Sequence, residues 1–174
     1  MLQDLLEKNK NTILKRWSDL TFSSYPPETA QFLSRQSNEF ANPVGAAIIK
    51  SSKGIMDWIV SGAPDANMAE IHLLLDDVVR IRAVQEFSAS EAVGFIFLLK
   101  KAVRDTLSKY IRDSNLLDEL YQLDSTVDQL ALEAFNIYMK CRERVFEIRA
   151  TELRNRTSRI LERACMKYGA PHEW

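Results

Sequence analysis

Apolar residues recur every three or four positions along most of the chain, the spacing that places them on one face of an α-helix. No stretch shows the strict alternation of a half-buried strand, so the pattern predicts helices throughout. Five helices are expected before the last one. Four of them cover about residues 2–22, 29–36, 43–60 and 89–112. The other, fourth along the chain, begins at a cap formed by Asp65 or Asn67 and ends at a turn near Phe87.

Prolines and glycines mark the ends of these helices. Tyr25-Pro-Pro-Glu28 ends the first one, because neither proline can donate the backbone bond that a continuing helix needs. Asn42-Pro43 is a start signal, with asparagine as the cap and proline in the first turn. Gly62 and Pro64 end the helix that begins there.

The most specific stretch of the sequence is RIRAVQEFSASEAVGFIFLLKK, residues 80–101. Ser88 and Glu91 have the spacing of a capping box, in which each side chain bonds the backbone N–H of the other residue. Residues 92–99 then carry no polar side chain. We therefore expect the central buried helix here, with Phe95 and Phe97 in the core.

The last helix is predicted to be about 50 residues long, since no glycine or proline occurs between Leu116 and Tyr168. Its apolar seam thins after Ile148, where basic residues outnumber glutamates. A helix this polar must project into solvent, pair with a second copy or dock on a partner. We expect the interaction surface at Arg144, Ile148, Glu152 and Arg156.

These elements predict an all-α fold, a compact helical bundle with a long C-terminal helix, for which a globin-like arrangement is one form. Residues 1–148 would make the helical domain, and residues 149–174 the polar continuation of the last helix and a tail. The length of 174 residues and the 46% apolar content suit one domain with a real core.

Composition narrows the classes of function. A formal net charge of −1 argues against nucleic acid or a membrane surface as the partner. Cys141 and Cys165 have no metal-binding or disulfide-framework spacing, and the mixed charges of MLQDLLEKNK are unlike a signal peptide. We expect a cytoplasmic protein with no metal and no cofactor.

The chain offers few candidates for chemistry. His72 is expected to pair with Asp76 one turn later on the helix surface; the alternative makes it a haem ligand in a globin-like ligand-binding sensor. Asp76 has a second partner in Arg80, four residues on. No catalytic triad and no glycine-rich phosphate loop is recognisable, so we predict no catalytic residues and no enzyme.

Arg82 stands apart because it shares the helix face of Ile71, Leu75 and Val78. A guanidinium that starts from a buried face needs a polar partner, and Glu86, one turn on, could supply it. In the alternative, Arg82 and Gln85 point into a cleft and hold an anionic ligand or a partner's carboxylate. Arg80, Arg82 and Gln85 are therefore the candidate ligand or partner contacts.

Residues 80–101, with the early Trp17, the DWIVSG segment ending at Gly62 and the helix YMKCRERVFEIRATE, resemble the RsbT co-antagonist N-terminal domain of the RsbRD type. The resemblance covers nearly the whole chain. It implies an all-helical sensory module, found upstream of an anti-sigma antagonist (STAS) domain or a histidine kinase, whose last helix carries a signal to that output domain.

Because the sequence ends six residues after Tyr168, we expect no STAS or kinase domain in this chain. We therefore expect a non-enzymatic domain of stress or other signal transduction that acts through protein–protein interaction. Its C-terminal helix would form a homodimer or bind a separate regulatory protein.

Overall fold

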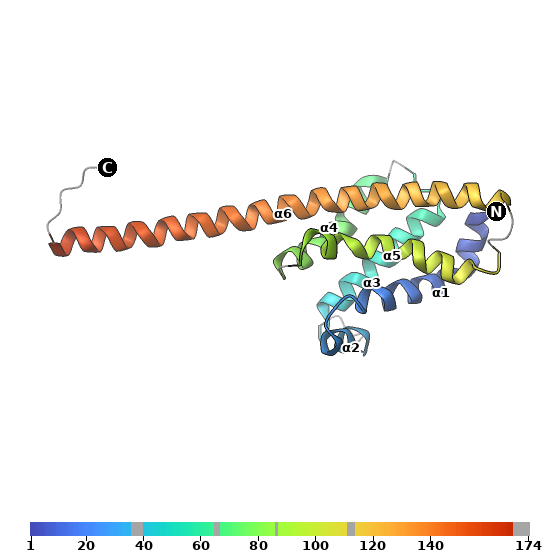
Figure 1. The fold of residues 1–174 in the computed structure, drawn as a ribbon, viewed down its shortest axis with the longest axis horizontal. Coiled ribbons are helices and arrows are strands. Elements are labelled where there is room, and N and C mark those ends of the chain that lie inside the picture. Colours follow the sequence, from blue (N-terminus) through green and yellow to red (C-terminus); the bar gives the residue numbers. More distant parts are fainter. Residues whose placement is uncertain (36–39, 65–66, 86, 111–113, 169–174) are drawn as a thin grey trace.

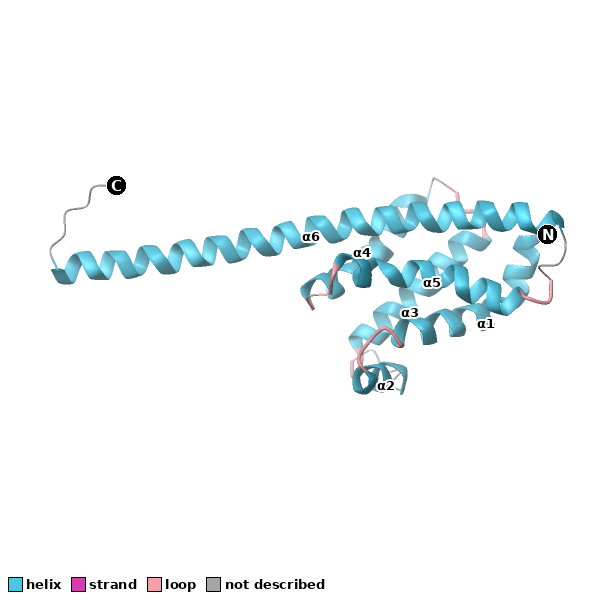
Figure 2. Cartoon of the chain, viewed as in Figure 1, coloured by secondary structure: helices cyan, strands magenta, loops and turns pink. Residues whose placement is uncertain are grey.

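The computed structural model describes residues 1–35, 40–64, 67–85, 87–110 and 114–168, and every element in those ranges is helical (Figures 1 and 2). This confirms the predicted all-α fold with a long C-terminal helix. The helices are α1 (Leu2–Phe22), α2 (Pro27–Arg35), α3 (Pro43–Val60), α4 (Met68–Val84), α5 (Ala89–Leu107) and α6 (Ser114–Tyr168).

The body of the molecule consists of α1 to α5 and the first half of α6, which lies along α4 and α5 (Figure 1). Its core is aliphatic and aromatic, and Trp17, Phe95 and Leu99 are at most 1% exposed. The indole Nε1 of Trp17 donates a hydrogen bond of 2.7 Å to the carbonyl of Phe95, which joins α1 to α5. The burial of Phe95 and Leu99 confirms the prediction that α5 is the central buried helix.

One part of that prediction is wrong. Phe97 is 46% exposed, and Lys100 Nζ lies 5.6 Å from the centre of its ring. Phe97 shares a strip of α5 with Lys101 and Arg104, and the side chains of this strip stay exposed although Arg104 bonds Asp124 of α6.

The helix ends follow the predicted signals with small shifts. Pro27 opens α2, two residues before the expected start, because proline fits the first turn of a helix as well as it ends one. The Asn42 side chain accepts a 2.9 Å bond from Gly45 N–H and donates one of 2.9 Å to the Leu33 carbonyl. α5 ends at Leu107, five residues before the expected end, and α6 begins at Ser114.

The predicted capping box at the start of α5 is confirmed. The Glu91 carboxylate accepts from the Ser88 backbone N–H at 2.9 Å, and the Ser88 hydroxyl accepts from the Glu91 N–H at 3.4 Å. Bonds from the Ser88 side chain and backbone lower the pKa of the Glu91 carboxyl. Because the folded pKa is the lower one, the stabilisation from Glu91 is present above its unfolded pKa and is lost as the pH falls through the folded value.

We expect Ser88→Ala to lower the free energy of unfolding by about 1 kcal/mol at neutral pH and by less in acid, where Glu91 becomes protonated. Urea unfolding at the two pH values measures the difference. Ser90→Ala is the matched control, since the Ser90 hydroxyl contacts only Ser88 Oγ, at 3.2 Å. Equal losses for the two variants would contradict the role of the cap.

The last helix, α6, is 55 residues long, which corresponds to about 80 Å. Salt bridges from Lys100 to Asp128, at 2.6 Å, and from Arg104 to Asp124 hold its first half against α5. The last α6 side chain that is partly buried against the body is Val145. We call residues 146–167 the arm; all of them except Cys165 are exposed, and Figure 1 shows the arm extending away from the body.

Candidate functional site

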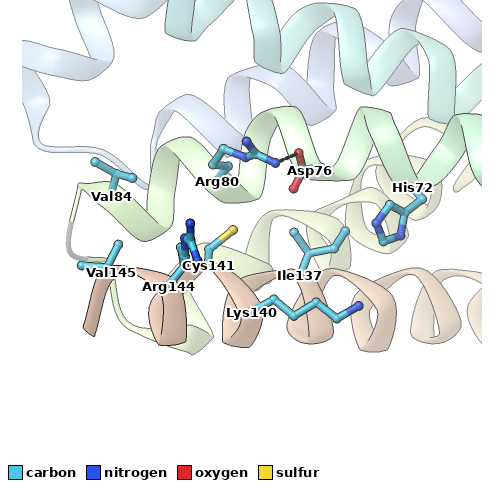
Figure 3. Close-up of a pocket in the computed structure, with 9 residues that line it drawn as sticks. All are labelled: His72, Asp76, Arg80, Val84, Ile137, Lys140, Cys141, Arg144 and Val145. Atoms are coloured by element: carbon cyan, nitrogen blue, oxygen red, sulfur yellow. Dashed lines mark hydrogen bonds and ion pairs between the residues drawn. The ribbon is translucent and has the colours of Figure 1, made fainter. Parts of the chain in front are cut away.

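A groove between α4 and α6 lies at the point where α6 leaves the body (Figure 3). Its volume is about 460 Å³, and it is open to solvent along one side. It is lined by His72, Asp76, Arg80 and Val84 of α4 and by Ile137, Lys140, Cys141, Arg144 and Val145 of α6. Two of these, Arg80 and Arg144, were predicted as contact residues from sequence, and the structure brings them to one site.

The groove has an apolar floor and a basic rim. Ile137 is buried, and Cys141 and Val145 are half-buried, because the core-facing seam of α6 passes here. Lys140 and Arg144 stand on α6 one turn apart. Arg144 has only a long ion pair of 3.4 Å with Glu147, and Lys140 has no ion pair with any described residue. The rim therefore favours an anionic group attached to an apolar one.

The polar contacts on α4 are only partly those predicted. Arg80 Nη2 donates to Asp76 Oδ2 at 2.5 Å, as its position four residues on predicts. His72 does not pair with Asp76; its Nδ1 lies 2.6 Å from Oε1 of Glu133. The expected local pair is wrong because α6 packs alongside α4 and brings in a carboxylate 61 residues away. This contact engages one ring nitrogen of the only histidine in the groove.

Cys141 is the only cysteine among the residues that line the groove. Burial raises the pKa of its thiol, the charge of Asp76 raises it further, and Arg80 opposes this in part. The group is therefore a thiol at neutral pH and a poor nucleophile. Among the described residues, no cluster of three or more His, Cys, Asp or Glu side chains is placed to hold a metal ion.

Arg82 starts from the buried face, as predicted, and is fully enclosed. Its guanidinium donates to the Glu91 carbonyl at 2.9 Å and to Ser24 Oγ at 3.3 Å. Its central carbon lies 4.9, 5.3 and 5.0 Å from the ring centres of three aromatic residues, Tyr25, Phe87 and Phe95. The expected partner, Glu86, lies outside the described residues.

Burial lowers the pKa of Arg82, and the nearby phenol of Tyr25 opposes this shift. The side chain joins α4 to the start of α5 and to the turn after α1, and it does not line the groove. Gln85 is exposed at the end of α4. The three candidate contacts Arg80, Arg82 and Gln85 thus lie in three different environments, and their role in binding stays a prediction.

The predicted interaction surface is exposed as well. Arg144 borders the groove, while Ile148, Glu152 and Arg156 lie on the arm. Ile148 is 49% exposed, so a partner can reach it. Three further apolar residues of the arm were not predicted as part of this surface, and they are 59–68% exposed: Phe146, Leu153 and Ile160. Their regular spacing of seven residues was the signal that could have revealed them.

A comparison with known protein families shows which family the chain belongs to. The family model described as the RsbT co-antagonist protein rsbRD N-terminal domain matches residues 11–153. The chain belongs to this family. The match to the RsbRD N-terminal domain covers most of the body, the whole groove and the first turns of the arm. Membership indicates a regulatory role in stress signalling. No curated protein and no solved structure matches the chain.

Proposed function

We propose that this RsbRD-type domain is a non-enzymatic, cytoplasmic regulatory module that acts by binding another protein chain through the arm of α6. The observation that carries the proposal is the division of α6, one unbroken helix, into a half packed in the core and a half in solvent. A 22-residue exposed helix gains little stability from its own residues, which favours a partner that covers it.

The groove between α4 and α6 would be the place where a signal reaches the domain. A molecule or peptide bound there would touch α4 and α6 together. Two bonds hold α6 beside the groove: Arg142 Nη1 donates at 3.3 Å to the carbonyl of Ala83, near the end of α4, and Tyr138 Oη donates at 2.8 Å to the carbonyl of Phe87, between α4 and α5. Occupation of the groove would therefore act on the segment of α6 from which the arm extends. Among the described helices, none is both long and apolar enough to cross a membrane.

Removal of the arm tests the proposal. We expect a chain that ends at Ile148 to unfold cooperatively within about 3 °C of the full chain, because the lost residues bury almost nothing against the body. We also expect cells that carry this chain to respond to stress like cells that lack the whole protein. Calorimetry and induction of stress genes measure the two effects.

Two outcomes would contradict the proposal. A fall of 10 °C or more in the melting temperature, a loss of several kcal/mol, would make the arm part of the folding unit. A wild-type stress response from the shortened chain would show that the arm is dispensable. A chain with Asn155→Ala is the control, since it changes an exposed arm residue and keeps the helix.

A further inference from the structure

The apolar floor of the groove between α4 and α6 continues onto the arm. Its α6 members, Ile137, Cys141 and Val145, are four residues apart and therefore share one face of the helix. Ile148, three residues further on, lies on the same face and is 49% exposed. Val84 of α4 lines the same end of the groove and is 63% exposed. We call these five residues the apolar strip; it runs from the body to the first turn of the arm.

A row of positive charge borders the apolar strip on α6. Lys140 and Arg144 are exposed and one turn apart, and Lys140 has no ion pair with any described residue. Arg144 has a pair of 3.4 Å with Glu147, and both side chains are largely in solvent, so this pair contributes little. On the α4 wall, by contrast, Arg80 and Asp76 neutralise each other at 2.5 Å. The α6 edge of the groove therefore favours a partner that carries carboxylates.

The shape of the groove favours a protein segment over a small molecule. Sites for small molecules usually enclose about 70–90% of the ligand, whereas this groove is open to solvent along one side. Figure 3 shows His72 at one end of the groove and Val84 and Val145 at the other. Along α6 the apolar strip extends from residue 137 to residue 148, about 16 Å or three helical turns. An open groove of this length suits the apolar face of an amphipathic helix.

We propose that the apolar strip binds an acidic amphipathic helix of a partner protein, whose carboxylates face Lys140 and Arg144. The inference rests on the proposed function and names the chemistry of a partner. Arg144 and Ile148, two of the four residues predicted from sequence as the interaction surface, both lie in this site. A helix bound here touches α4 and α6 together, so it fixes the direction in which the arm leaves the body.

Selection from a peptide library tests the chemistry of the partner. The library consists of peptides of about 14 residues, a length of about 21 Å as a helix, with leucine every three or four positions and free choice elsewhere. We expect the immobilised full chain to enrich peptides with aspartate or glutamate four residues apart beside the leucines. Selection without such enrichment, or no selection at all, would overturn the inference.

Charge reversal tests the place of binding, with a selected peptide and fluorescence anisotropy. We expect Lys140→Glu with Arg144→Glu to weaken binding about tenfold or more, and added salt to weaken binding to the unchanged protein. Arg154→Glu with Arg159→Glu is the matched control. It makes the same change of charge on exposed arm residues beyond the strip, and its affinity should stay within about twofold. Equal affinities for the two variants would contradict a site at the groove.

A second pair of variants tests the apolar contact. Ile148→Ala removes part of the strip at an exposed position, so the fold should persist, and we expect the affinity for the peptide to fall about fivefold. Leu153→Ala is the control, since Leu153 is exposed on the arm but about 140° further around the helix. Circular dichroism verifies that both variants stay folded. If both bind the peptide as the unchanged chain does, the strip is not the binding surface.

The inference and the proposed function fail separately. A chain that ends at Ile148 keeps the whole apolar strip and should bind the selected peptide as tightly as the full chain does. If no peptide binds at the groove and the shortened chain still loses its stress response, the acidic helix is wrong and the proposed function stands. If the peptide binds at the groove but the shortened chain keeps its full response, the site is correct and the arm is not the output.

Discussion

Replacing Arg82 with alanine is expected to lower the free energy of unfolding by about 3 kcal/mol. The side chain fills a fully enclosed site, contacts three aromatic rings and satisfies a carbonyl and a hydroxyl. Truncation leaves a cavity between α4, α5 and the turn after α1, and it removes the attraction of the cation for the rings. Urea unfolding followed by circular dichroism measures the loss.

Arg82→Met separates the contribution of volume from that of charge. Burial lowers the pKa of this guanidinium, which means that its charge is costly where it lies. We therefore expect methionine, similar in length and uncharged, to cost only about 1 kcal/mol. Arg80→Ala, on an exposed side chain two residues earlier, should cost less than about 0.5 kcal/mol. A methionine variant as unstable as the alanine variant would mean that the hydrogen bonds hold this corner together.

Trp17→Ala is expected to have the largest effect, a loss of about 4 kcal/mol. The indole is fully buried and lies nearly parallel to the ring of Phe95, at 11° with centroids 6.4 Å apart. Its removal opens the contact between α1 and the central helix. Unfolding should be followed by far-ultraviolet circular dichroism, because the substitution itself changes the tryptophan fluorescence.

Trp17→Phe keeps most of the ring volume but loses the bond from Nε1 to the Phe95 carbonyl. We expect this variant to cost about 1–2 kcal/mol, between the wild type and the alanine variant. Trp58→Phe is the comparison, since Trp58 also donates to a carbonyl, that of Pro64, but at the edge of the core. An alanine variant within 1 kcal/mol of the wild type would contradict the central place of Trp17.

Local signals in the sequence predict the helices of this fold well. The cap at Asn42, the box at Ser88 and the absence of glycine and proline from the last helix act on the backbone within a few residues, so their effect can be read without knowledge of the tertiary structure. The exposure of Phe97 could not be predicted from such local signals. An apolar run around a helix says that most of it is covered, but only the packing of neighbouring helices decides which strip stays open.

The candidate site is harder to predict for the same reason. The groove joins residues of α4 to residues of α6 some 60 positions later, and the partner of His72 comes from that later helix. Arg82 was recognised as buried from its place among apolar neighbours, whereas its aromatic surroundings come from three separate segments. The apolar residues Phe146, Leu153 and Ile160 of α6 can be seen in the sequence, but other apolar residues lie between them and the start of the helix. Only the structure shows that those earlier residues, such as Leu130 and Ile137, are buried while these three are exposed.

The attachment of α6 near Tyr138 and Arg142 gives the helix the properties of a lever. These two residues bond the end of α4 and the segment between α4 and α5, and beyond them the arm extends for about 33 Å without further support from the body. A tilt of about 10° at this fulcrum displaces the tip of a helix of that length by roughly 6 Å, more than one helical turn. A change at the groove too small to alter the packing of the body would therefore be amplified at the far end of the chain.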